Sequence, residues 1–400
     1  MPGTQSIRPA PAGPRLRVVA HAGFLLIGIV NTLLGPILPM LTLKWQLGDD
    51  QAGQLFTAQF AGGMTGSAVS GFLVERLGFL PVIASGFAIM SVATGALVWI
   101  SQGGGLVSFF CLGLALGLAI PATNLLVAEL NPQRRAAALN ILNLLWGTGA
   151  VAGPLLISGL GRGVSLARPM LALSGLLAAM MILATSCPNV LHSTTTADSS
   201  SPRLPLQTVW RSPFVLLTEM LVFLCVGTEA ATGGWIASYA DRLGEAGRAL
   251  STLTPSLFWA GLLAGRGLSP LLLGHLNEGS LLRHSLLMAV TGLGIVLFGQ
   301  SVLATFVGTA LAGLGLAPVF PTTFAVLVER CGVRTPQLTA ATFLLASLGG
   351  AVIPWLVGFT SDRYGDLRIG LVVVLIGGLL MVALQIVISA TRSDSEAPAC

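Results

Sequence analysis

The sequence predicts an all-α membrane protein in which twelve transmembrane helices form two pseudo-symmetric six-helix bundles. First, hydrophobic residues make up 54% of the 400 residues and charged residues only 9%, with a mean hydropathy of +0.86. Soluble proteins carry about 25% charged residues, so this chain has too few polar groups to cover its surface in water. Second, its apolar runs are near the length of roughly 20 residues that crosses a bilayer. Third, the two halves of the chain repeat.

This composition excludes several classes of protein. A soluble enzyme, a nucleic-acid-binding module and a disordered scaffold all need far more polar residues. The net charge is +5, but the 20 basic residues do not cluster, so no nucleic-acid partner is expected. The 50 glycines are typical of closely packed transmembrane helices. The partner that the composition predicts is the lipid bilayer.

Twelve apolar runs, separated by short polar or Gly/Pro breaks, mark the spanning helices in chain order. Ser212-Pro213 and Thr254-Pro255 each place a hydroxyl before a proline, which is typical of a helix start. The predicted spans are about 18–41, 52–74, 79–101, 106–129, 135–160, 168–187, 213–237, 253–274, 282–300, 302–328, 337–360 and 367–391.

One interruption differs from the others. Residues 188–211 are rich in Ser, Thr and Pro and have no apolar period, which predicts a flexible linker. The linker separates an N-terminal six-helix bundle (18–187) from a C-terminal one (212–391). Short tails, 1–17 and 392–400, flank the two bundles.

The halves carry the same landmarks at a constant offset. Pro121 and Glu129 lie eight residues apart in the fourth span, and Pro321 and Glu329 lie eight apart in the tenth, 200 residues later. The fifth and eleventh spans repeat a similar glycine and proline pattern. Agreement of several such residues at one offset predicts a duplicated bundle, with the fourth and tenth spans in equivalent positions.

The distribution of Arg and Lys predicts the topology. If the N-terminus lies inside, twelve of the 20 basic residues fall on the inner side and seven on the outer side. Positive residues favour the cytoplasmic side. The termini and the linker are therefore expected in the cytoplasm, and the protein in the plasma (inner) membrane.

The loop between the second and third spans carries a family signature. Residues 71–79 (GFLVERLGF) resemble the G-x-x-x-[D/E]-R-x-G-[R/K] motif of the major facilitator superfamily, with Phe79 in place of the last basic residue. The resemblance covers about residues 18–391 and implies the major facilitator fold. Glu75 and Arg76 are then expected to pair with Glu129 and Arg134 as a cytoplasmic gate. The alternative is a solvated loop with incidental charges, since exposed ion pairs are weak.

A second resemblance is narrower. Residues 226–239 (VGTEAATGGWIASY) contain a G-x-E followed by G-W and are similar to the fucose- and glucose-type sugar symporter group. The first span around Asn31 and the second span at Gln59-Phe60 are also similar to it. That group carries carboxylates in its first and fourth spans, and this chain has none there. The proton chemistry of the group therefore does not carry over to this chain.

Two ionisable residues fall well inside predicted spans, where a charge costs at least about 2.5–3.5 kcal/mol. They are Glu229 in the seventh span and Arg266 in the eighth. Glu229 is predicted to couple transport to an ion by taking up and releasing a proton, with Arg266 as its charge-balancing partner in the coupling site. Alternatively it holds Na⁺ or accepts hydrogen bonds from sugar hydroxyls, or the two residues form a permanent structural pair.

Neutral polar and aromatic residues on several spans are the candidates for recognising a neutral polyol. Amides and hydroxyls offer donors and acceptors without net charge, and aromatic faces stack on sugar rings. Packing and helix–helix hydrogen bonds are the alternative role of each. The predicted substrate-binding set is Asn31, Gln59, Asn124, Asn143, Trp146, Glu229, Trp235, Phe258, Trp259, Thr322 and Phe343.

The sequence thus predicts a secondary active transporter that works by alternating access. The expected reaction is symport of a sugar or related small polar metabolite with H⁺ or Na⁺. The alternative is a proton-coupled exporter of drugs or other lipophilic or lipid substrates. No Walker A motif and no catalytic constellation occur in the sequence, so an enzyme is not expected. No cofactor or metal is predicted, and the protein is expected to be a monomer.

Overall fold

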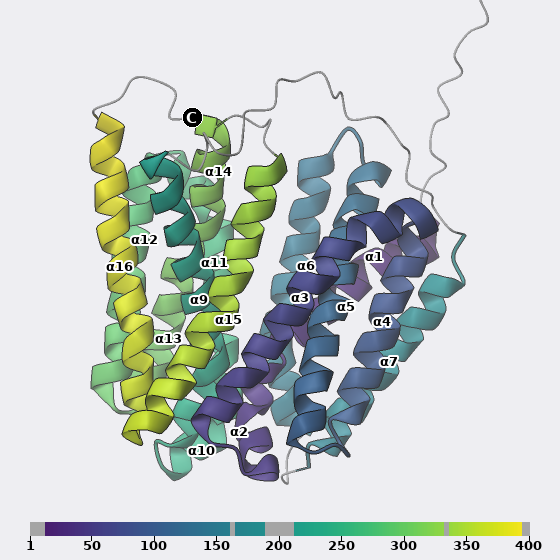
Figure 1. The fold of residues 1–400 in the computed structure, drawn as a ribbon, viewed down its shortest axis with the longest axis horizontal. Coiled ribbons are helices and arrows are strands. Elements are labelled where there is room, and N and C mark those ends of the chain that lie inside the picture. Colours follow the sequence, from purple (N-terminus) through teal and green to yellow (C-terminus); the bar gives the residue numbers. More distant parts are fainter. Residues whose placement is uncertain (1–12, 161–164, 189–211, 332–335, 394–400) are drawn as a thin grey trace, which may run out of the picture.

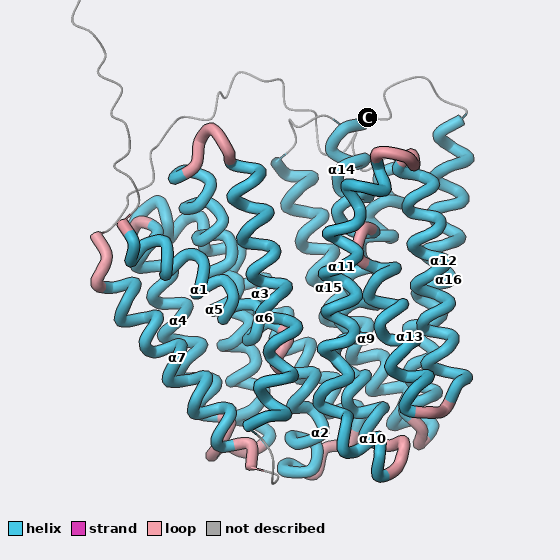
Figure 2. The backbone as a smooth tube through the Cα atoms, turned by 180° about the vertical axis from the view of Figure 1, so that it is seen from behind, coloured by secondary structure: helices cyan, strands magenta, loops and turns pink. Residues whose placement is uncertain are grey.

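The computed structural model describes residues 13–160, 165–188, 212–331 and 336–393. Within them the secondary structure is helical, and most of the loops lie at the two ends of the helices (Figure 2). The N-terminal half contains α1 (Pro14–Asn31), α2 (Leu34–Trp45), α3 (Asp49–Leu77), α4 (Phe79–Ala96), α5 (Gln102–Leu130), α6 (Arg135–Leu160) and α7 (Ala167–Thr185). The C-terminal half contains α9 (Pro213–Asp241), α10 (Glu245–Leu250), the short 3₁₀ turn η1 (Ser251–Leu253), α11 (Thr254–Leu273), α12 (Glu278–Gly299), α13 (Val302–Leu316), α14 (Val319–Cys331), α15 (Pro336–Tyr364) and α16 (Leu367–Ser393).

These helices account for the predicted spans. In the described part of the chain, ten helical segments are long and apolar enough to cross a bilayer, and the bent pair α1–α2 makes an eleventh. The remaining span is α3, whose 29 residues include several polar ones on the face that meets the other half. The linker 188–211 lies outside the described residues except for residue 188, as do most of both tails.

Two predicted spans are interrupted. The first was predicted as one helix over 18–41, but α1 and α2 meet at Thr32 with a bend of 44°. Pro36 has no backbone N–H to donate to the carbonyl of Thr32, which breaks the helical ladder at this point. The tenth span, predicted over 302–328, divides into α13 and α14 at Ala317-Pro318 for the same reason.

Glycine contacts show that the two halves are built alike. A Cβ atom at Gly149 of α6 would lie 2.0 Å from the carbonyl oxygen of Leu25 in α1, and a Cβ at Gly349 of α15 would lie 2.0 Å from that of Phe223 in α9. The two glycines are 200 residues apart and their partners 198. The predicted duplication is therefore confirmed at the level of individual contacts, because only glycine allows backbones to approach this closely.

The second and fourth spans repeat in the same way. Gly113 of α5 packs on the carbonyl of Gln59 in α3, and Gly313 of α13 packs on that of Phe258 in α11. The fourth and tenth spans thus occupy equivalent positions. We call positions 198 residues apart in α1–α2 and α9, or 199 apart in α3 and α11, pseudo-equivalent.

The two halves touch mainly toward one end of the molecule. The side on which α1 begins and α16 ends is here called the tail side, and the side with α10 the loop side (Figure 1). The halves meet through α3 and α15, α6 and α11, and α2 and α9. On α15, Gly350 packs on the ring of Phe60, whereas Phe343, two turns toward the tail side, is 51% exposed. On α3, Ser67, two turns from Phe60, is likewise exposed. The halves therefore separate toward the tail side.

Candidate functional site

A cavity of about 160 Å³ lies between the halves where they separate. Residues of α1, α2, α3, α6, α9 and α11 line it, so both bundles contribute. The lining residues are Asn31, Thr32, Leu34, Gly35, Phe56, Gln59, Phe60, Trp146, Val226, Glu229, Ala230, Gly233, Gly234 and Trp259. Five of them belong to the substrate-binding set predicted from the sequence: Asn31, Gln59, Trp146, Glu229 and Trp259.

The cavity is built on the internal repeat. Asn31 and Glu229 are pseudo-equivalent and both line it, as do Phe60 and Trp259. Gly35 is the pseudo-equivalent of Gly233, and the two touch: a Cβ at Gly35 would lie 2.4 Å from the Gly233 carbonyl oxygen. Contact between pseudo-equivalent residues is what a two-fold axis between the bundles produces. The cavity therefore lies at the pseudo-symmetry axis.

The ionisable groups break this symmetry. Glu229 stands where the N-terminal half has an amide, and its carboxylate lies 3.8 Å from the guanidinium of Arg266. Arg266 also lies over the ring of Trp146 from the other half, 5.7 Å from its centroid. This pair is longer than a hydrogen bond, so each partner keeps capacity to bind another group. The charged wall of the cavity belongs to the C-terminal half.

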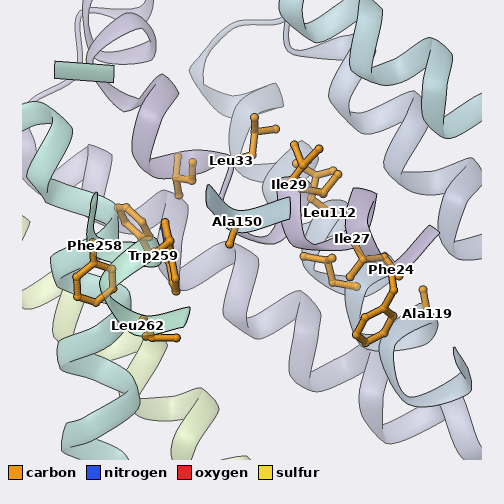
Figure 3. Close-up of a cluster of buried hydrophobic side chains, with 14 of the residues drawn as sticks. Phe24, Ile27, Ile29, Leu33, Leu112, Ala119, Ala150, Phe258, Trp259 and Leu262 are labelled. Carbon is orange, nitrogen blue, oxygen red and sulfur yellow. The ribbon is translucent and has the colours of Figure 1, made fainter. Parts of the chain in front are cut away.

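Aromatic residues form another wall. The rings of Trp146 and Trp259 meet edge to face, with centroids 5.7 Å apart. The ring of Phe258 packs edge to face against Trp259, with centroids 5.1 Å apart, and the two lie beside each other in the apolar core (Figure 3). The indole N–H of Trp259 is buried and has no hydrogen-bond partner. A buried donor without a partner costs free energy.

The amides near the cavity differ in their availability. The side chain of Gln59 donates to the backbone carbonyl of Asn31 at 3.2 Å, which ties α3 to the end of α1. The hydroxyl of Thr32 donates to the Gly28 carbonyl within its own helix. The Asn31 side chain is exposed at the helix end and free to meet a ligand.

The other members of the predicted set lie outside the cavity lining. Trp235 is fully buried, and its indole N–H donates to the Pro354 carbonyl at 2.9 Å, so its polar atom is already used. Phe258 is also fully buried, and Asn124 donates to its own helix at Ile120. Thr322 is buried in α14.

Asn143 and Phe343 lie toward the tail side. Asn143 is exposed on α6, about one turn from Gly147, which packs on Leu263 of the other half. Phe343 is exposed and forms a ring cluster with Phe320 and Phe324, at centroid distances of 5.9 and 5.7 Å.

The residues predicted to form a cytoplasmic gate lie at the tail-side ends of α3 and α5 and at the start of α6. Glu75, Arg76 and Arg134 are exposed, and Glu129 is half-buried. The guanidinium of Arg76 stacks on Phe72, one turn earlier in the same helix, at 4.3 Å.

Sequence reasoning missed a set of contacts that closes the loop side. Arg242 at the end of α9 forms a two-pronged ion pair with Asp49 at the start of α3. Ser361 of α15 also donates to Asp49. Next to it, the indole N–H of Trp355 donates to Asp50 at 3.0 Å. We call these five residues the loop-side latch. No local pattern in the sequence pairs Asp49 with Arg242, because the two residues lie 193 positions apart.

No grouping of three or more His, Cys, Asp or Glu side chains that could hold a metal ion occurs among the described residues.

Two helical bundles around a central polar cavity, closed on one side and separated on the other, define a membrane transporter rather than an enzyme. The chain belongs to the Major Facilitator Superfamily, whose family model matches residues 20–354.

Known relatives are distant in sequence. The chain is 23% identical over 396 residues to the sodium-dependent glucose transporter 1 of Danio rerio, covering 84% of this chain and 63% of that protein. It is 22% identical over 362 residues to the glucose/mannose transporter GlcP of Bacillus subtilis, covering 86% of this chain and 87% of that one. The chain thus spans less than two thirds of the length of the fish protein.

Among solved structures, a bacterial homologue of the human lysosomal transporter Spinster, in an inward-facing and occupied conformation, superposes with a TM-score of 0.80. The match covers 99% of this chain and 100% of that one at 14% identity. At this identity the likeness shows the fold alone.

Proposed function

We propose that the protein is an ion-coupled symporter of a sugar or related small polar metabolite, which binds in the central cavity. The observation that carries the proposal is the lining itself: amides, two indoles and a single carboxylate from both halves converge at the pseudo-symmetry axis. Neutral amides and indoles suit a polyol that offers many hydroxyls and no charge. The names of the relatives, glucose and glucose/mannose transporters, support the same substrate class.

Glu229 is the coupling group in this proposal, with Arg266 as its charge-balancing partner. A carboxylate at membrane depth is costly unless it has a function or a partner. The separation of 3.8 Å leaves Glu229 able to take up H⁺ or Na⁺ when the cavity is open. The name of the fish relative favours Na⁺.

The gate residues Glu75, Arg76, Glu129 and Arg134 are proposed to close the tail side when the loop-side latch opens. Glu75, Arg76 and Arg134 are exposed in this conformation, as expected of a gate that is open. Alternating access then exchanges one set of contacts for the other.

The membrane orientation is part of the proposal. An excess of Arg on the tail side favours a cytoplasmic location for both termini and the linker, in the plasma (inner) membrane. The substrate would then leave the open tail side into the cytoplasm.

One observation favours the second candidate, a proton-coupled exporter of lipophilic compounds. The rings of Phe320, Phe324 and Phe343 form an apolar cluster toward the open side. An amphiphile would gain from that surface, whereas a sugar would not.

Counterflow in proteoliposomes separates the two candidates. Purified protein is tested against a panel of sugars, amphiphiles and cationic dyes, with and without H⁺ and Na⁺ gradients. Counterflow of a labelled hexose, driven into net accumulation by one of the gradients, is the expected result. Uncoupler-sensitive transport of a dye with no hexose counterflow would replace the symporter by the exporter.

A further inference from the structure

A second carboxylate is buried in the C-terminal half, away from the cavity. Glu219 of α9 is 2% exposed and faces α15. It lies on the same helix face as the backbone of Phe223 and as Gly227, which pack on Gly349 and Ile353 of α15. Glu219 therefore sits in the tight seam between α9 and α15, about 15 Å along α9 from Glu229 at 1.5 Å per residue.

If the Glu219 carboxylate is ionised, the acceptor oxygens around it outnumber the available hydrogens. The hydroxyl oxygen of Thr342 lies 2.5 Å from Glu219 Oε1 and 2.9 Å from the carbonyl oxygen of Leu338. A threonine hydroxyl has one hydrogen, so it cannot donate to both acceptors. The second carboxylate oxygen, Oε2, is buried with no partner.

A proton on Glu219 resolves the surplus of acceptors. The protonated Oε1 then donates to the Thr342 oxygen, and Thr342 donates its own hydrogen to Leu338. Each of the two short contacts is then a hydrogen bond with its own hydrogen, running from Glu219 to Thr342 and from Thr342 to Leu338. The unpartnered Oε2 is left as a neutral carbonyl oxygen, which costs far less to bury than a charged one.

The surrounding charges do not neutralise Glu219. Among the described residues no Arg, Lys or His forms an ion pair with it. Glu278 of α12 and Arg330 of α14 line a small groove together with Phe214 and Thr218 of α9. The Arg330 guanidinium lies over the ring of Phe214 at 4.6 Å. Apart from Thr342, the α15 residues that pack on α9 here are the apolar Gly349 and Ile353.

We propose that Glu219 is a second proton-binding site, occupied in this conformation. Its proton can leave only when α9 and α15 part enough to admit water, so occupancy follows the conformation of the C-terminal half. A role of this proton in coupling rests on the proposed ion-driven transport. The presence of the proton on Glu219 does not depend on that proposal.

Infrared spectroscopy of the full-length protein in lipid tests the occupancy. A protonated buried carboxyl gives a C=O stretching band that is separate from the bands of carboxylates and amides. At neutral pH this band should be lost in Glu219→Gln, kept in Glu229→Gln and shifted in Thr342→Val, which removes the hydrogen-bond partner. Loss of a carboxylate band in Glu219→Gln, with the acid band unchanged, would overturn the proposal.

Transport measurements test the coupling. Glu219→Gln keeps the shape of the neutral acid, and Glu329→Gln, at an exposed position of α14, is the matched control. Glu219→Gln should retain counterflow and lose proton-gradient stimulation, while the control keeps both. Unchanged proton stimulation in Glu219→Gln would refute the coupling role. Absence of hexose counterflow in the unmodified protein would refute the proposed substrate, and the infrared result would still decide the occupancy.

Discussion

The loop-side latch should set the balance between the two open conformations, and Asp49→Asn is its most direct perturbation. The carboxylate of Asp49 accepts two hydrogen bonds from Arg242 and one from Ser361, bridging the halves. Asparagine keeps the size but loses the charge and one acceptor oxygen. The latch is absent when the loop side opens, so the substitution destabilises only the closed form.

The size of the expected effect follows from how exposed the Arg242–Asp49 ion pair is to water. The Arg242 side chain is 45% exposed, so the pair is screened by water, and exposed pairs contribute about 0.2–1 kcal/mol. Two parallel charge-assisted hydrogen bonds and the additional Ser361 donor raise this to roughly 1–2 kcal/mol. Since 1.4 kcal/mol is a factor of ten, the population with an open loop side should rise about tenfold.

Distance measurements between spin labels provide the assay. Labels at residues 51 and 248, exposed on α3 and α10, report the separation of the halves on the loop side. Asp49→Asn should increase the fraction at long distance about tenfold, and Arg242→Gln should do the same. Glu245→Gln, which removes an exposed carboxylate of α10, is the control and should change nothing. An unaltered distribution in both latch variants would refute the reasoning.

Three further predictions follow from the described contacts. Trp259→Phe should raise KM for substrate several-fold, because the smaller phenyl ring leaves less aromatic surface on this wall of the cavity; a KM equal to that of the unmodified protein would argue against contact with the substrate. Gly349→Ala should lower the midpoint of thermal unfolding, since its Cβ would lie 2.0 Å from the Phe223 carbonyl oxygen. Gly294→Ala, which has open space around it, is the control and should leave the midpoint unchanged. Equal midpoints for the two variants would contradict close packing between α9 and α15. Arg76→Ala should slow turnover more than it weakens substrate binding, measured by transport rate and by equilibrium binding, and unchanged turnover would remove the gate.

The sequence was sufficient for the architecture because that information is local or periodic. Apolar runs of membrane-spanning length mark the helices, and Pro and Glu at one offset mark the duplication. The same logic found Glu229 and Asn31, since a polar group inside an apolar run is conspicuous. The breaks in the first and tenth spans were missed, although Pro36 and Pro318 mark both.

The remaining features depend on contacts that no local pattern encodes. Trp235 and Trp259 look alike in sequence, but only one borders the cavity, because the side that a helix presents is set by its neighbours. Asp49 and Arg242 are ordinary helix-end charges until the fold joins them. Glu219 lies only six residues from the start of the predicted seventh span, and the fold buries it against α15.

Glu229→Gln tests whether an ion bound at Glu229 in the cavity drives substrate transport. Labelled hexose uptake is measured in proteoliposomes twice, once as counterflow and once as accumulation driven by an imposed H⁺ or Na⁺ gradient. Glutamine preserves shape and hydrogen bonding but cannot titrate or supply a negative charge. Counterflow should persist while gradient-driven accumulation is lost. A well-folded Glu229→Gln protein that accumulates substrate normally under the gradient would contradict this expectation.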